Sequence, residues 1–290
     1  MKHRIPGALI VVAPAALVVI VLLVGGMTTA LYEAVMPAPG KTGGPSLDHF
    51  RAVLSAPGFL SSLALTFWVS LASTVLTLAL GVLTALSLRR LQSLRRLVTY
   101  TYQLPLTVPH LVLAAAGFMM LSQSGLLSRA LTAAGVIDSP AGFPELVHDR
   151  GGVGIILAYV WKQVPFVGLF ALAVLQAVGE DYEAAARTLG AKPLQAVRHV
   201  LVPLVAPGLV PAGLIVFAFV FGAFEVPLLL GARYPSMLSV LAYRLHTDAD
   251  LTLRPQSMAL SFVIALIVVA LAGASRGIAA IGAVRENGST

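Results

Sequence analysis

The chain has 290 residues, of which 58% are hydrophobic and only 11% are charged, and its mean hydropathy is +0.91. Soluble domains carry about 25% charged residues, so this composition excludes a globular protein that faces water on every side. The absence of cysteine excludes disulfide frameworks, iron–sulfur clusters and thiolate zinc sites. We therefore expect a chain that lies within a lipid bilayer.

Six apolar stretches each reach the length of about 20 residues that a membrane-spanning helix needs. They are too long for membrane β-strands and lack the required alternation of apolar and polar residues. The predicted spans are residues 8–31, 59–88, 97–121, 152–178, 207–230 and 258–281. The first stretch follows Lys2 and Arg4 and could instead be a secretory signal, but it exceeds the 7–15 apolar residues of a signal core. The sequence thus predicts an all-α membrane protein with six transmembrane helices.

The distribution of Lys and Arg predicts how the spans are oriented. If the N-terminus is cytoplasmic, eleven of the 19 basic residues lie in cytoplasmic segments. These are Lys2, Arg4, Arg89, Arg90, Arg95, Arg96, Arg187, Lys192, Arg198, Arg276 and Arg285. The outside loops are neutral overall, so both termini are expected in the cytoplasm. Because the basic residues flank the spans and do not form one solvated face, no nucleic-acid partner is expected.

A polar segment at 179–203, between the fourth and fifth predicted spans, has the pattern of a helical hairpin. Glu183 suits the positive end of a helix dipole, and the alanines that follow it favour helix. Gly190 suits a left-handed cap at the end of the first helix. Pro203 is expected to end the second helix or to mark the entry to span five. A hairpin of this kind on the charged side of the membrane is a docking element.

This segment resembles the EAA loop in the permease subunits of bacterial binding-protein-dependent ABC importers. The family pattern is Glu-Ala-Ala, three residues, Gly, nine residues and Ile-x-Leu-Pro, and here valine occupies both aliphatic positions. Counted from Gly190, the motif glutamate falls on Ala184, one residue after Glu183. The resemblance implies that the segment couples the chain to an ATPase. The residues assigned to coupling are Glu183, Ala184, Ala185, Ala186, Arg187, Gly190 and Pro203.

The resemblance also implies an architecture and a set of partners. It implies a MetI-like type I importer bundle, with one permease domain over 1–290, a peripheral first helix at 8–31 and a five-helix core at 59–281. The implied partners are a cytoplasmic ATP-binding subunit dimer, a second permease subunit of the same or a homologous sequence, an extracytoplasmic solute-binding protein and the lipid bilayer. Such a subunit of the bacterial inner membrane is not an enzyme and needs no cofactor or metal, because a partner chain hydrolyses ATP.

Three shorter stretches, 104–110, 161–166 and 222–231, are similar to permeases of the polyamine, thiamine and ferric-iron group. The resemblance therefore implies a polyamine-like or other small charged solute.

Three ionisable residues, His110, Lys162 and Glu225, fall within predicted spans. An ionisable side chain at membrane depth costs about 3 kcal/mol on insertion scales, so each needs a partner, water or a polar interior. Lys162 and Glu225 either line the translocation pathway or form a buried ion pair that orients spans four and five. His110 either lines the pathway or has a packing role. Two other classes are a secondary transporter, which predicts paired unwound helices, and a membrane-embedded enzyme, which predicts clustered catalytic residues.

Overall fold

The computed structural model describes residues 5–89, 95–178 and 181–287, and every element of secondary structure within them is helical. Arg90, Glu180 and the start of the predicted hairpin at 179–180 lie outside the described residues. Six helical stretches are long and apolar enough to cross a membrane. They are Val12–Val35, Phe59–Leu88, His110–Ala133, Val153–Ala177, Pro193–Gly222 and Leu251–Leu271. The predicted all-α membrane fold with six spans is therefore confirmed.

The predicted third span is not one continuous helix. Residues 97–121 form α4 (Arg95–Thr107) and α5 (His110–Leu121). Pro109 has no N–H with which to continue the helix, and a residue before proline, here Val108, is driven out of the α region. The third membrane-length stretch accordingly lies at His110–Ala133.

The predicted fifth span at 207–230 is also interrupted. Its helix α10 (Val202–Gly222) ends at a glycine, and Ala223 is extended with φ −68° and ψ 145°. A separate short helix, α11 (Glu225–Leu230), then begins. Glu225 therefore lies at the start of α11 and not inside span five, contrary to the prediction.

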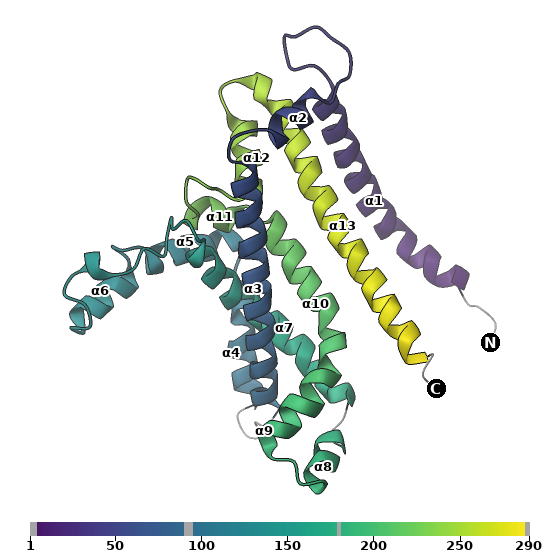
Figure 1. The fold of residues 1–290 in the computed structure, drawn as a ribbon, viewed down its shortest axis with the longest axis vertical. Helices are drawn as coiled ribbons and strands as arrows, with labels where there is room; N and C mark the ends of the chain where they lie inside the picture. Colours follow the sequence, from purple (N-terminus) through teal and green to yellow (C-terminus); the bar gives the residue numbers. More distant parts are fainter. Residues whose placement is uncertain (1–4, 90–94, 179–180, 288–290) are drawn as a thin grey trace. The chain divides into compact units, whose positions relative to one another are not determined.

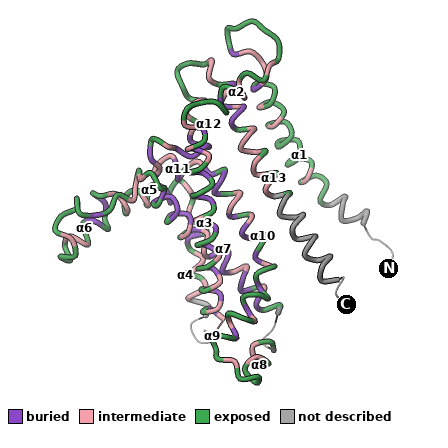
Figure 2. The backbone as a smooth tube through the Cα atoms, viewed as in Figure 1, coloured by how far each residue is buried: buried purple, intermediate pink, exposed green. Residues whose placement is uncertain are grey.

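The chain forms two compact units, and the first comprises the residues up to Phe59 together with Leu238–Leu271. It contains α1 (Ile5–Val35), α2 (Asp48–Leu54), α12 (Leu238–Thr247), a 3-10 turn (Leu251–Leu253) and the first half of α13 (Arg254–Asn287). Ser257 Oγ donates to Ala242 O at 2.7 Å and joins α13 to α12. The rings of Phe50 and Phe262 meet edge to face and join α2 to α13. In α1 the large apolar side chains from Val12 onward are exposed (Figure 2), which suits a helix surrounded by lipid or by another chain.

The second unit contains α3 (Phe59–Leu88) and the elements up to α11. Besides α4, α5, α10 and α11, these are α6 (Leu126–Ala133), a 3-10 turn (Pro140–Gly142), α7 (Val153–Val178), α8 (Asp181–Thr188), α9 (Pro193–Ala196) and a π-helical segment (Val197–Leu201). Helix α7 packs against α4, α5, α10 and α11 (Figure 1). Its buried residues, with Tyr159 and Val167 among them, belong to one apolar core.

Small residues bring the spans of this unit close together. A Cβ added to Gly81 of α3 would lie 2.6 Å from Val167 Cγ1 of α7, closer than real side chains pack. Helix α3 also buries a row of hydroxyls at every fourth position, and each hydroxyl donates to the carbonyl four residues earlier. These bonds run from Thr66, Ser70 and Thr74, each at 2.7 Å. They satisfy polar groups that would otherwise lie unpaired in the bilayer.

Candidate functional site

The segment 181–203 forms a helical hairpin at one end of the second unit (Figure 1). Helix α8 ends before Gly190, whose φ of +85° is the left-handed conformation that glycine adopts without strain. The Gly190 N–H donates to Arg187 O, and the Ala191 N–H donates to Ala186 O, each at 3.0 Å. The Gln195 side chain accepts from the Lys192 N–H at 2.9 Å and caps α9.

Pro203 does not end the second helix of the hairpin. The helix runs on from α9 through the π-helical segment Val197–Leu201 into α10, where Pro203 is the second residue. Proline removes the N–H that would bond to the carbonyl of His199, and a π-turn absorbs such a mismatch within a continuous helix. The hairpin is therefore joined to span five by an unbroken helical rod.

Glu183 ties the hairpin to the end of α3. Its carboxylate accepts from Arg89, the residue that follows α3, and from Arg187 one turn later in α8 at 2.7 Å. Burial alone would raise the pKa of Glu183, but the hydrogen bonds and charges of the two arginines together lower the pKa below its usual value. Glu183 thus makes an ion pair from one position before the motif glutamate. From the sequence, Arg89 was predicted only as a cytoplasmic charge, and its ion pair with Glu183 was missed.

The other side of the hairpin exposes apolar side chains. Leu189 and Leu194 are 89% and 77% exposed, and Tyr182 is more than half exposed. Ala184 and Ala185 are also exposed beside them, whereas Ala186 is half-buried (Figure 2). Two leucines in open contact with water on a polar segment indicate a surface that another protein covers.

The three ionisable residues predicted in the spans come together at the two helix breaks. His110 opens α5, and its ring lies 4.8 Å from that of Phe219 in the last turn of α10. Lys162 of α7 and Glu225 of α11 both interact electrostatically with His110. Tyr159, one turn before Lys162, packs edge to face on Phe219 with 6.1 Å between centroids. Tyr159 and Phe219 were missed, because single aromatic residues in apolar stretches give no signal beyond burial.

Lys162 and Glu225 do not form the ion pair that the sequence analysis considered, since no ion pair joins them among the described residues. The Lys162 ammonium donates to Pro105 O at 3.1 Å and to Val108 O, and its side chain is only 5% exposed. Glu225 is exposed in the first turn of α11. The Glu225 carboxylate is thus the exposed group of this cluster, whereas the His110 ring is half-buried and its Nε2 is buried without a hydrogen-bond partner among the described residues.

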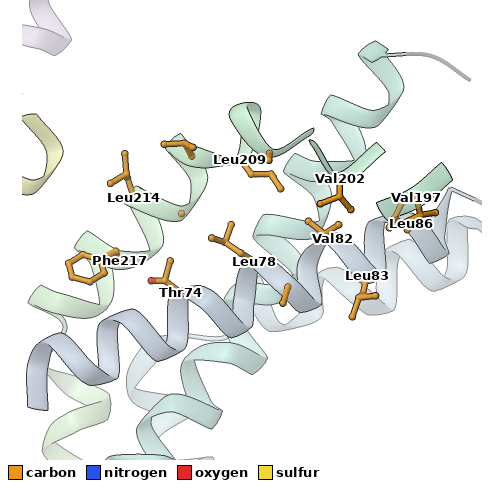
Figure 3. Close-up of a pocket in the computed structure, with 14 residues that line it drawn as sticks. Thr74, Leu78, Val82, Leu83, Leu86, Val197, Val202, Leu209, Leu214 and Phe217 are labelled. Carbon is orange, nitrogen blue, oxygen red and sulfur yellow. The ribbon is translucent and has the colours of Figure 1, made fainter. Parts of the chain in front are cut away.

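An apolar groove of 690 Å³ lies between α3 and α10 (Figure 3). Leu78 and Val82 of α3 face Leu209 and Phe217 of α10, and Thr74 is the one residue of the lining with a hydroxyl. This lining suits hydrocarbon or another helix, and it offers a polar solute little to bind.

A helical membrane bundle with interrupted spans and polar residues at the breaks is typical of membrane transport subunits. A family model described as "Binding-protein-dependent transport system inner membrane component" matches residues 77–281. The chain belongs to this family.

Two relatives and two solved structures illustrate the similarity. The molybdenum transport system permease protein ModB of Mycobacterium tuberculosis is 30% identical over 230 residues, which cover 76% of this chain and 81% of ModB. The sn-glycerol-3-phosphate transport system permease protein UgpA of Agrobacterium fabrum is 26% identical over 272 residues, with 90% and 89% covered. A chain of a bacterial ABC transporter that imports alginate has the same fold, with a TM-score of 0.73, 19% identity and coverage of 93% and 96%. A second structure of a bacterial alginate transporter, in complex with a periplasmic protein, gives a TM-score of 0.69 at 18% identity, with 96% and 99% covered.

The predicted permease family, the MetI-like fold and the role as a transport subunit without enzymatic activity are confirmed by these similarities. The chain is a multi-pass component of an inner-membrane transport system that depends on a binding protein. The narrower similarity to polyamine, thiamine and ferric-iron permeases finds no support in these relatives.

Proposed function

We propose that this permease forms the translocation pathway of an ATP-driven importer together with a second permease subunit of the same or a homologous sequence. In this proposal the hairpin at 181–203 docks on a cytoplasmic ATPase dimer, both termini are cytoplasmic, and an extracytoplasmic binding protein delivers the solute. The observation that carries the proposal is the hairpin itself. Its apolar side is exposed at Leu189 and Leu194, while Glu183 anchors the opposite side to the end of α3.

The polar cluster at the helix breaks is the proposed solute pathway. Glu225 is its exposed group, His110 is half-buried, and Lys162 is buried. The permease domain extends over 1–290 in this proposal, with the core at 59–281 around the pathway. Helix 8–31 is peripheral and supplies an apolar surface for lipid or for the second permease.

We propose a small anion with a tetrahedral oxygen-bearing centre as the solute, in place of the polyamine that the short motifs favoured. The support comes from relatives named for molybdenum and for sn-glycerol-3-phosphate transport, since molybdate and the phosphate group share that chemistry. Within the cluster Lys162 and Glu225 carry opposite charges, so local charge alone favours neither sign.

Uptake into proteoliposomes tests the solute and the energy source together. The chain would be co-purified with its ATPase, second permease and binding protein, and uptake of radiolabelled molybdate, phosphate ester and putrescine would be compared with and without ATP. We expect ATP-dependent uptake of an anion. Uptake of putrescine without uptake of either anion would contradict the proposed anion and favour a polyamine as the solute. Uptake driven by an ion gradient without ATP would favour a secondary transporter, a class in which paired helix breaks also occur.

Replacement of Gly190 tests the docking role of the hairpin. We expect Gly190→Val to reduce co-purification of the ATPase about tenfold, because a left-handed residue with a Cβ costs on the order of 1–2 kcal/mol. Gly190→Asn is the matched control, since asparagine tolerates this conformation, and no atom lies within 4 Å of the added Cβ. Equal ATPase recovery with valine and asparagine would contradict the docking role.

A further inference from the structure

We infer that Lys162 is a positioning residue: its ammonium replaces the backbone donor that Pro109 removes, and so holds α5 in register with α4 and α7. The inference rests on the proposed transport function where solute uptake is measured, and it is independent of that function where distances within the chain are measured.

The break between α4 and α5 leaves a particular carbonyl without its helical donor. In an α-helix the carbonyl of Pro105 would accept from the N–H of residue 109, and residue 109 is a proline. The Val108 N–H donates to that carbonyl at 3.4 Å, which is long for a hydrogen bond. An unpaired carbonyl at membrane depth is costly, because lipid offers it no donor.

Lys162 supplies the missing donor from a different helix. Its Nζ donates to Pro105 O in the last turn of α4 at 3.1 Å and also to Val108 O within the break. An ammonium carries three donors, so one side chain serves both carbonyls. The side chain is 5% exposed, and its partners among the described residues are carbonyls, not a carboxylate.

The position of α5 depends on the two hydrogen bonds from Lys162, which we call the Lys162 clamp. Helix α5 begins two residues after Val108 and carries His110, and it packs along α11, where a Cβ on Gly117 would lie 3.2 Å from Leu230 Cδ1. The clamp from α7 thus sets the direction in which α5 leaves α4. It also sets the placement of His110 beside Phe219. A purely packing role for Lys162 would not require an ammonium.

The test compares Lys162→Met, Lys162→Arg and the double variant Lys162→Met/Pro109→Ala, each in the complete transporter. Methionine keeps the length of the stem without a donor, arginine keeps the donors, and alanine at 109 restores the backbone N–H. Since the chain has no cysteine, spin labels can be attached at single introduced cysteines. Met119 on α5 and Leu157 on α7 are exposed and suit such labels.

We expect Lys162→Met to broaden the distance distribution between these labels and to reduce uptake about tenfold or more. Lys162→Arg keeps the donors, so its distance distribution should stay close to wild type. The double variant should recover a narrow distance distribution, because Pro105 O regains its helical donor. A narrow distribution and full uptake in Lys162→Met would overturn the inference, as would a broad distribution in the double variant equal to that of Lys162→Met. The label distances are read without transport, so failure of the proposed function would appear separately, as absent uptake in wild type.

Discussion

Arg89→Glu is expected to reduce ATP-dependent uptake about tenfold or more, because it places two carboxylates together at the joint between α3 and the hairpin. In the native chain Arg89 and Glu183 are largely buried at this joint, with side chains 16% and 13% exposed. Among the described residues, this ion pair joins the hairpin at 181–203 to the end of α3. Loss of this link would leave the hairpin joined to the bundle through its chain connections to α7 and α10. Uptake by proteoliposomes and co-purification of the ATPase measure the effect.

Two further variants separate this joint from general surface charge. Arg187→Ala removes the other partner of Glu183, but Arg187 is 53% exposed within the same helix, and exposed pairs at this spacing contribute only about 0.3–0.5 kcal/mol. We expect its uptake to remain close to wild type. The exchange Arg89→Glu/Glu183→Arg re-forms the pair and should recover most of the uptake. The interpretation fails if Arg187→Ala is as damaging as Arg89→Glu or if the exchange recovers nothing.

Gly168→Ala is expected to lower the stability of the bundle. The added Cβ would lie well inside van der Waals contact with the Tyr102 hydroxyl and 2.9 Å from Thr84 Oγ1. That hydroxyl is held between α3 and α7, with Thr84 at 2.6 Å and Val164 O at 2.8 Å. The tyrosine would have to leave both partners, and overpacking of this kind costs about 1–3 kcal/mol. Thermal unfolding of the detergent-solubilised chain measures the loss.

The matched control is Gly26→Ala in α1, where nothing lies within 4 Å of the added Cβ. Its unfolding temperature should stay the same or rise, since alanine is the better helix former. Tyr102→Phe removes the clashing oxygen, so Gly168→Ala should cost less in that background than in wild type. An equal loss in both backgrounds would show that the hydroxyl is not the obstacle.

The helical class and the number of spans could be predicted because they follow from the length and polarity of each stretch. The helix breaks could not be placed by hydropathy, since an apolar stretch has the same hydropathy whether or not its backbone is continuous. Pro105 and Pro109 were visible signals for the first break. Nothing as strong marks the second, where Gly222 and Ala223 end α10 within a run of apolar residues.

The candidate sites also differ in how far apart along the chain the residues that form them lie. The hairpin was predictable because the cap at Gly190 and the helix before it are encoded within a few residues. The partners of Lys162 and Glu183 were not, because Pro105 and Arg89 lie 57 and 94 residues away along the chain. Opposite charge favoured Glu225 as the partner of Lys162. In the structure the Lys162 ammonium instead donates to two backbone carbonyls at the break between α4 and α5.

The π-helical segment at Val197–Leu201 fixes the rotational phase of the hairpin about the axis of α10. A π-turn holds one residue more than an α-turn, and each residue of an α-helix turns the chain by about 100°. Removal of a single residue from this segment would therefore restore a regular helix with Leu194 facing close to its present side, whereas removal of a residue from the regular turns of α10 would swing Leu194 about 100° around the helix axis. The π-turn thus lets the rod between Gly190 and Pro203 carry one extra residue while the exposed side of the hairpin, with Leu194 on it, keeps the direction that a regular helix would give it.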